Sequence, residues 1–356
     1  MRSSGATAMP FDAVAALLDE AVARHLTPAA VIEVGSTRDV RWHFETGRLT
    51  YAADAPACTR DTIFDLASLT KVIATTSLAM RAVEQDARWL DTSIAALEPR
   101  WRGADREAVT VRQLLDHSSG LPPHVGVFET AHGRAQFLDA IATMPLAFRP
   151  GTESQYSDLG FILLGLLLEA RLGAPLGALF AGVAGHLDGP IEFNPAAARM
   201  PAIAPTERDP WRGRLLQGEV HDENAAALGG VAGHAGLFGT ARSVGSFAQA
   251  VLQTFQADTW LARRDTMQLF ATRSAVPGSS RALGWDTMLP ASSCGTRMSA
   301  RAIGHTGFTG TSLWIDPENA VYVALLTNRV HPSRDGEGIQ QLRRDVHDAV
   351  MAAIAR

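Results

Sequence analysis

The segment Ser68-Leu69-Thr70-Lys71 pairs a hydroxyl nucleophile with an amine base three residues later. It follows a strand-like stretch at 62–64 and precedes a helical run that begins at Val72, so both side chains would share one face at a helix start. At that position, backbone N–H groups and the helix dipole favour developing negative charge. Because a serine hydroxyl needs a nearby base, the pair predicts acyl-transfer chemistry, with Ser68 attacking a carbonyl and Lys71 accepting its proton.

Lysine is used once in the whole chain. Of the 32 lysine and arginine residues, 31 are arginine and the remaining one is Lys71. Arginine stays protonated in proteins, whereas burial can bring a lysine toward its neutral, proton-accepting form. In the alternative interpretation, Ser68 is a helix cap and Lys71 is a solvated residue, the one lysine left by chance in a chain that otherwise uses arginine. A cation in the first turn opposes the helix dipole, which counts against that alternative.

The second candidate is Tyr156-Ser157-Asp158, which enters a helical run at 159–171 and contains one of only three tyrosines. A phenol beside a lysine ammonium can have its pKa lowered, and can then relay a proton between nucleophile and leaving group. In the alternative interpretation, Tyr156 is a packing aromatic and Asp158 is a helix cap.

The third candidate is the glycine-rich segment from Gly304 to Gly310, directly before a strand-like run near the C-terminus. Glycines let an edge strand run close to a substrate, and a backbone N–H there can complete an oxyanion hole. An isolated segment of this kind is otherwise a turn or a bulge.

The two ends of the chain supply the elements of a sheet. An amphipathic helix is predicted at 11–24 and a closing helix at 339–354. Four segments have strand-like patterns, namely 29–34, 40–45, 311–315 and 320–326. We therefore expect an α/β fold of the α+β kind, with an antiparallel sheet that is built from both chain ends and flanked by helices.

The middle of the chain is different, because helical patterns alternate there with long loops rich in glycine and proline. The predicted helices are 72–84, 111–115, 135–143, 161–171 and 244–255. We expect a sheet domain made of 1–66 and 283–356, a mainly helical domain at 67–282, and an active site in the cleft between them.

Composition excludes some partners. The net charge of -5 arises from scattered charges without a basic block, so we expect no nucleic acid and instead a small-molecule or peptide substrate. Cys58 and Cys294 lack metal-ligand spacing and could form one disulfide or none. No stretch is long and apolar enough to span a bilayer. Acidic residues interrupt the N-terminal apolar pattern, so we expect a cytoplasmic chain, or a periplasmic or secreted one if a signal has been removed.

A cluster at His221-Asp222-Glu223 invites a metal interpretation, but its spacing fits no common site. We therefore expect neither a metal nor another cofactor. A Ser-His-Asp triad on a nucleophile elbow is also excluded, since the sequence has no G-x-S-x-G.

In this order, the three segments resemble the S-x-x-K, Y-x-N and K-T-G or H-T-G motifs of the penicillin-recognising serine hydrolases, with a β-lactamase/transpeptidase-like fold. That superfamily includes class C β-lactamases, D-alanyl-D-alanine carboxypeptidases and related carboxylesterases. Flanking segments at 111–122 and 283–286 resemble it as well, and the resemblance covers nearly the whole chain. It implies that Ser68 is acylated, Lys71 is its base and Tyr156 relays protons. It also implies an oxyanion hole made by the backbone N–H groups of Ser68 and Phe308.

Two positions depart from the motifs of the superfamily. Asp158 stands where an asparagine usually binds the substrate amide, so a donor is replaced by an acceptor or a charge. His305 stands where β-lactamases have lysine, which weakens the fixed positive charge for a substrate carboxylate. With Thr306 and Gly307, these residues are the expected substrate-binding positions.

The departures favour a peptidase or an esterase over a dedicated β-lactamase, and our first prediction is a D-alanyl carboxypeptidase-like hydrolase of cell-wall peptides or β-lactams. A carboxylesterase for small acyl esters is the close alternative, and an inactive penicillin-binding sensor module is the alternative from another class. The sequence predicts no particular oligomeric state.

Overall fold

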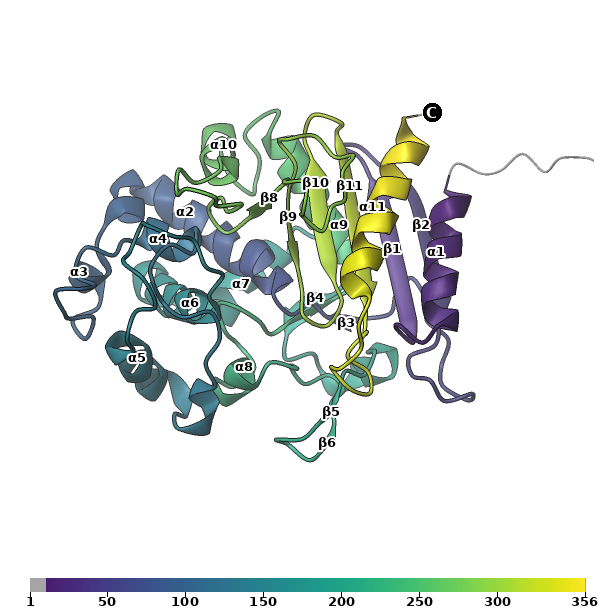
Figure 1. Cartoon of the computed structure of the whole chain (residues 1–356), viewed down its shortest axis with the longest axis horizontal. Coiled ribbons are helices and arrows are strands. Elements are labelled where there is room, and N and C mark those ends of the chain that lie inside the picture. Colours follow the sequence, from purple (N-terminus) through teal and green to yellow (C-terminus); the bar gives the residue numbers. More distant parts are fainter. Residues whose placement is uncertain (1–10, 356) are drawn as a thin grey trace, which may run out of the picture.

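The computed structural model describes residues 11–355, and its centre is a six-stranded antiparallel sheet (Figure 1). In spatial order the strands are β2 (Val40–Gly47), β1 (Ala29–Gly35), β11 (Val321–Thr327), β10 (Ser312–Asp316), β9 (Ile303–Thr306) and β8 (Asp286–Thr287). β1 lies beside β11, with Ala30 opposite Thr327, so the two ends of the chain meet in the middle of the sheet. The predicted antiparallel sheet with flanking helices is thereby confirmed.

Helices cover both faces of this sheet. α1 (Asp12–Ala23) and α11 (Ile339–Ile354) contact each other on one face, and α9 (Ala241–Thr254) packs against β1, β10 and β11 on the other (Figure 1). Every residue of β1 and β11 is buried as a result. Alternate side chains of β1 point to opposite faces, so Ala30, Ile32 and Val34 join the core under α1 and α11, whereas Ala29 and Val31 join the other.

The remaining helices form a layer beside the sheet and share the larger hydrophobic core with its α9 face. They are α2 (Ser77–Gln85), α3 (Ile94–Leu97), α4 (Val111–Leu115), α5 (Gly133–Thr143), α6 (Asp158–Leu172), α7 (Leu176–Ala184), α8 (Glu223–Ala227) and α10 (Arg264–Ala271). The central one, α6, begins at the cap residue Ser157, whose hydroxyl accepts the Gly160 N–H, and ends at Gly173 in a left-handed conformation (φ 76°).

Two small sheets lie outside the central one. The first contains β3 (Phe64–Asp65), β7 (Leu237–Gly239) and β4 (Ile191–Phe193), and the second pairs β5 (Arg208–Asp209) with β6 (Arg214–Leu215). β3 fixes the segment that leads to Ser68.

The predicted helices and strands of the chain ends match the observed elements to within two residues at each end. The helix expected at 161–171 begins earlier, at Asp158, because Ser157 caps it there. α9 lies within 67–282 yet packs on the sheet, and the proposed domain boundaries stay a prediction. Cys58 and Cys294 are both buried and unpaired.

Two expectations concern an export signal and membrane-spanning helices. Residues 1–10, part of the segment inspected for an export signal, lie outside the described residues. No single helix within 11–355 is long and apolar enough to cross a membrane; α6 and α7 together reach that length and composition but are bent by 81°.

Candidate active site

The segment before Ser68 is held in an uncommon backbone conformation. Ala67 has φ 46°, in the left-handed region that residues with a Cβ rarely adopt. The buried Asp65 carboxylate accepts the Ala67 N–H at 2.8 Å and the His221 N–H at 2.7 Å, which fixes this turn. The helix begins at Leu69 and contains a π-helical turn, Lys71–Thr76, before it continues as α2. Such turns and strained residues are found at functional sites.

The Lys71 ammonium is fully buried, and each of its three N–H donors has an acceptor. Nζ lies 2.9 Å from Ser68 Oγ, 2.7 Å from Asp158 Oδ1 and 2.9 Å from the carbonyl oxygen of His234. Burial lowers the pKa of Lys71, and the Asp158 carboxylate offsets part of that effect. The predicted partnership of Ser68 with Lys71 therefore exists in the fold, with a lysine displaced toward its neutral form.

The Tyr156 hydroxyl lies 2.7 Å from Ser68 Oγ and 3.1 Å from Asp158 Oδ1, the carboxylate oxygen that Lys71 also binds. Since the phenol donates to Asp158, the Ser68 hydroxyl donates to the phenol. The expected lowering of the Tyr156 pKa is wrong. Burial raises this pKa well above 10, and the negative charge of Asp158 raises it further. Tyr156 is a protonated phenol that joins Ser68 to Asp158.

Asp158, the first residue of α6, is an ionised carboxylate rather than the amide donor of the related motif. Burial alone would raise its pKa, but the Lys71 ammonium, together with His124 and His234, holds that pKa well below its usual range. Its place at a helix N-terminus also favours the negative charge. An ion pair with Lys71 thus occupies the corner where the superfamily motif has an amide.

His305 is buried and lines the cavity in front of Ser68. Its Nδ1 lies 2.8 Å from the Thr306 carbonyl oxygen, so Nδ1 carries the ring proton. Burial lowers the pKa of His305 well below 6.5, and the nearby Lys71 and Arg281 lower it further. At neutral pH His305 therefore supplies no positive charge at this position.

The turn after β9 packs directly against the segment that carries the nucleophile. The Thr309 hydroxyl donates to the Asp65 carbonyl at 2.7 Å, and the Thr311 hydroxyl donates to the Leu66 carbonyl at 3.1 Å. A Cβ at Gly307 would lie 2.7 Å from the Leu66 carbonyl oxygen, which explains why this position needs glycine. Two backbone segments separated by about 240 residues therefore lie side by side.

Two backbone N–H groups at this junction remain available to a substrate. Among residues 11–355, neither the Ser68 N–H nor the Phe308 N–H donates a hydrogen bond to the protein. Paired free N–H groups beside a nucleophile are the donors that stabilise a developing oxyanion. The Phe308 side chain is half exposed, and its ring stacks on His221.

A cavity of about 610 Å³ brings the predicted residues together. Seven of the eight predicted site residues line it, and Lys71 lies buried behind Ser68; the seven are Ser68, Tyr156, Asp158, His305, Thr306, Gly307 and Phe308. Sequence reasoning missed Arg281, which also lines the cavity and whose guanidinium lies 5.3 Å from the centre of the Tyr156 ring. One arginine among 31 carries no signal of its own in the sequence.

Sequence reasoning also missed the role of His117. This buried, neutral histidine accepts the Ser157 N–H at 3.1 Å, and its ring lies 4.8 Å from that of Tyr156. It therefore supports the turn that presents Tyr156 and Asp158 to Ser68.

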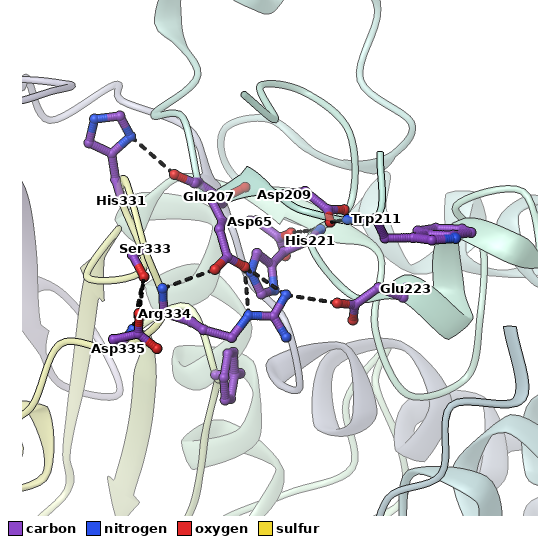
Figure 2. A network of polar contacts seen from close by, with 12 residues as sticks. Asp65, Glu207, Asp209, Trp211, His221, Glu223, His331, Ser333, Arg334 and Asp335 are labelled. Carbon is purple, nitrogen blue, oxygen red and sulfur yellow. Dashed lines mark hydrogen bonds and ion pairs between the residues drawn. The ribbon is translucent and has the colours of Figure 1, made fainter. Parts of the chain in front are cut away.

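Figure 2 shows a second polar network, three of whose residues, His221, Glu223 and Arg334, line the same cavity as Phe308. Glu207 accepts from His221 at 2.8 Å and from Arg334 at 2.7 Å, and Arg334 also reaches Glu223 at 2.7 Å. Asp222 is paired separately with His234 at 2.7 Å. The His and acidic residues at 221–223 are therefore used in hydrogen bonds and in the ion pair of Glu223 with Arg334. Among residues 11–355, no group of three or more His, Cys, Asp or Glu could hold a metal ion.

Comparison with known proteins identifies a family and several relatives. The sequence model of the Beta-lactamase family matches residues 14–348. The "Putative D-alanyl-D-alanine carboxypeptidase" of Escherichia coli (strain K12) is 30% identical over 308 residues, covering 77% of this chain and 70% of that protein. The "N-acetylmuramyl-L-alanine amidase" of Bacillus subtilis (strain 168) is 32% identical over 306 residues, covering 76% of this chain and 68% of that protein.

A solved penicillin-binding protein homologue from Caulobacter crescentus has a TM-score of 0.77 at 20% identity, and the match covers 98% of this chain and 99% of that one. At that identity the likeness shows a shared fold, which agrees with the sheet and helix arrangement described above.

Proposed function

Because the chain belongs to the beta-lactamase family of serine hydrolases, we propose that it hydrolyses acyl bonds through an acyl-enzyme on Ser68. The observation that supports this most directly is the position of Ser68 Oγ, 2.9 Å from Lys71 Nζ and 2.7 Å from the Tyr156 hydroxyl, on the wall of the cavity. A nucleophile within hydrogen-bond reach of its base is the geometry that nucleophilic catalysis requires.

In the acylation step we propose, Lys71 is neutral, so the Ser68 hydroxyl turns from the Tyr156 oxygen to the Lys71 amine. It gives its proton to that amine while Oγ bonds to the substrate carbonyl carbon. The carbonyl π electrons move to its oxygen, and the N–H groups of Ser68 and Phe308 stabilise that negative charge. Lys71 is buried, so its lowered pKa makes the neutral form accessible at a lower pH than for a solvated lysine.

Collapse of the tetrahedral intermediate requires a proton on the leaving group. The protonated Tyr156 phenol lies beside Ser68 Oγ and delivers its proton to the leaving nitrogen or oxygen, then recovers one from the Lys71 ammonium through the hydrogen-bonded cluster. Water then attacks the ester carbonyl of acylated Ser68 and gives a proton to neutral Lys71. The bond between the carbonyl carbon and Oγ breaks, Oγ takes that proton back, and the carboxylic acid product leaves.

For the substrate we propose D-alanyl peptides of the cell wall. Support comes from the name of the Escherichia coli relative, "Putative D-alanyl-D-alanine carboxypeptidase". The name of the Bacillus subtilis relative, "N-acetylmuramyl-L-alanine amidase", supports a cell-wall substrate more generally. Neutral His305 argues against a dedicated β-lactamase, because the position where β-lactamases have a lysine carries no fixed charge here.

One observation favours a second candidate, a carboxylesterase for small acyl esters. The Asp158 carboxylate is bound to Lys71 and offers a substrate amide no N–H donor. An ester needs recognition only at its reacting carbonyl. The absence of a donor at Asp158 therefore reduces the binding free energy of an ester less than that of a peptide.

The test is a covalent adduct followed by a substrate panel. The intact protein and Ser68→Ala are incubated with a fluorophosphonate and with a penicillin, and the adduct mass and its position are determined. An adduct on Ser68 that Ser68→Ala lacks supports the proposal. No adduct with either reagent would favour an inactive binding module. Turnover of p-nitrophenyl esters, a D-Ala-D-Ala peptide and nitrocefin then separates esterase, peptidase and lactamase.

A further inference from the structure

Arg343 is a buried cation without a nearby acid. Its side chain on α11 is almost completely buried, and among residues 11–355 no carboxylate forms an ion pair with it. Burial lowers the pKa of Arg343 to about 9, which still leaves the guanidinium charged at neutral pH. A buried charge is expensive unless it is paired, so an arrangement of this kind calls for an explanation.

The guanidinium is directed at the turn that carries Phe308. Nη2 donates to the Gly307 carbonyl oxygen at 2.7 Å and to the Thr311 carbonyl oxygen at 2.8 Å, whereas Nε has no acceptor. The Gly307 carbonyl and the Phe308 N–H belong to one trans peptide unit, so they point in opposite directions. A donor that fixes the carbonyl therefore fixes the direction of the N–H.

We propose that Arg343 is a positioning residue of the oxyanion hole, which orients and polarises the Gly307–Phe308 peptide so that its N–H faces the reacting carbonyl. This inference rests on the proposed acyl transfer at Ser68. A charge-assisted hydrogen bond at the carbonyl draws electron density from the peptide and makes the N–H at its other side a stronger donor.

Holding the turn in place would not by itself require a charge. The Gly307 N–H already donates to the Thr311 carbonyl at 2.7 Å, the Gly310 N–H donates to the Gly307 carbonyl at 3.1 Å, and two threonine hydroxyls bind the turn to the nucleophile segment. Arg343 adds a positive charge at the Gly307 carbonyl, which the neutral Gly310 N–H already binds, whereas the Arg329 guanidinium binds the Phe308 carbonyl at 2.8 Å. What the charge supplies is electrostatic stabilisation at the other end of the peptide, where an oxyanion would form.

The experiment measures ester hydrolysis and the affinity for an arylboronic acid, whose adduct with a serine is a tetrahedral anion that places an oxygen in the oxyanion hole. Arg343→Met removes the charge and keeps the volume. Arg344→Met is the matched control, because Arg344 is the next residue of α11 and donates from the surface to the Pro290 carbonyl at 3.0 Å. We expect Arg343→Met to lower kcat about 10- to 100-fold with little change in KM, and to weaken boronate binding by a similar factor.

Arg343→Lys, which retains a cation, is expected to recover part of both losses, and Arg344→Met to leave both unchanged. If Arg343→Met does not fold, Arg343→Gln carries the same expectation, because it keeps a donor without the charge. A folded Arg343→Met or Arg343→Gln with kcat and boronate affinity within twofold of the parent would overturn the inference. If Ser68→Ala retained the esterase activity, the proposal for Ser68 would fail instead, so the two failures are distinguishable.

Discussion

Lys71 Nζ lies 2.7 Å from Asp158 Oδ1, in an ion pair whose lysine side chain is fully buried and whose aspartate is 15% exposed. The carboxylate stabilises the protonated lysine and so opposes the role of Lys71 as a base, while burial acts in the other direction. In the mechanism that we propose, the rate of acylation at a given pH therefore depends on the balance between these two effects. Asp158 sets that balance in a way that a neutral amide would not.

Asp158→Asn tests this balance. The carboxylate raises the pKa of Lys71, so its removal lowers that pKa, and the rising limb of the profile of kcat/KM against pH moves to lower pH. On the acidic side of the limb, each unit of displacement raises kcat/KM about tenfold. The measurement is ester hydrolysis between pH 5 and pH 10. An unmoved limb, or one displaced to higher pH, would contradict the assignment of Lys71 as the base.

Lys71→Arg preserves a positive charge but removes the only group that can become a neutral amine base here. We expect the rate of adduct formation at Ser68 to fall by about 10³-fold or more, since base and nucleophile act as a unit. Fluorophosphonate labelling followed by mass spectrometry measures this rate, with circular dichroism as the control for folding. Labelling of a folded Lys71→Arg at near the parental rate would refute the role.

The sequence was a good guide to the elements and to the residues that motifs mark. Apolar periodicity predicted α1 and α11 and the four long strands, because burial of one face or of both leaves a regular pattern. Ser68, Lys71, Tyr156 and Phe308 meet as expected, because each belongs to a short motif at a helix start or a strand end.

Long-range electrostatics left no such pattern. The predicted lowering of the Tyr156 pKa was wrong, because this pKa depends on burial and on the charge of Asp158. The spacing of a motif does not report burial. Arg281 and Arg343 could not be distinguished in a sequence with 31 arginines, since their importance comes from which side chains and carbonyls the fold places around them.

Gly307→Ala tests the close approach of the two backbone segments. The added Cβ would overlap the Thr311 hydroxyl and lie 2.7 Å from the Leu66 carbonyl oxygen, so the turn would have to move away from Ser68. We expect a fall in kcat of about 10²-fold, comparable to the loss of an oxyanion donor. Gly177→Ala in α7 is the control, because its Cβ would meet Val231 at an ordinary 3.7 Å. Equal kcat values for the two variants would show that this packing does not position Phe308.

The network around Glu207 predicts a loss of stability in acid (Figure 2). Burial would raise the pKa of Glu207, but hydrogen bonds from His221 and Arg334 outweigh it and lower this pKa from 4.5 to about 2. A carboxylate whose pKa is lowered on folding stabilises the protein above pH 4.5, and that stability is lost as the pH falls toward 2. The contribution is at most about 3 kcal/mol, and solvent around the partly exposed Arg334 reduces it.

Glu207→Gln removes this acid sensitivity. Urea unfolding of the parent and the variant at pH 7 and pH 3 measures it: the variant is expected to be less stable at pH 7, with a difference that shrinks at pH 3. A difference that is the same at both pH values would mean that Glu207 stabilises the fold by packing rather than by charge.

The order of the elements along the chain bears on when activity can arise during synthesis. β1 pairs with β11, and Arg343 of α11 donates to the Gly307 carbonyl. The chain makes Ser68 and Lys71 early, but the Phe308 N–H and the arginine behind it come about 240 and 275 residues later. A nascent chain that lacks α11 thus has a nucleophile whose oxyanion-hole donors are not yet held in place. On the mechanism that we propose, we therefore expect Ser68 to become fully reactive only after the last helix has folded onto the sheet.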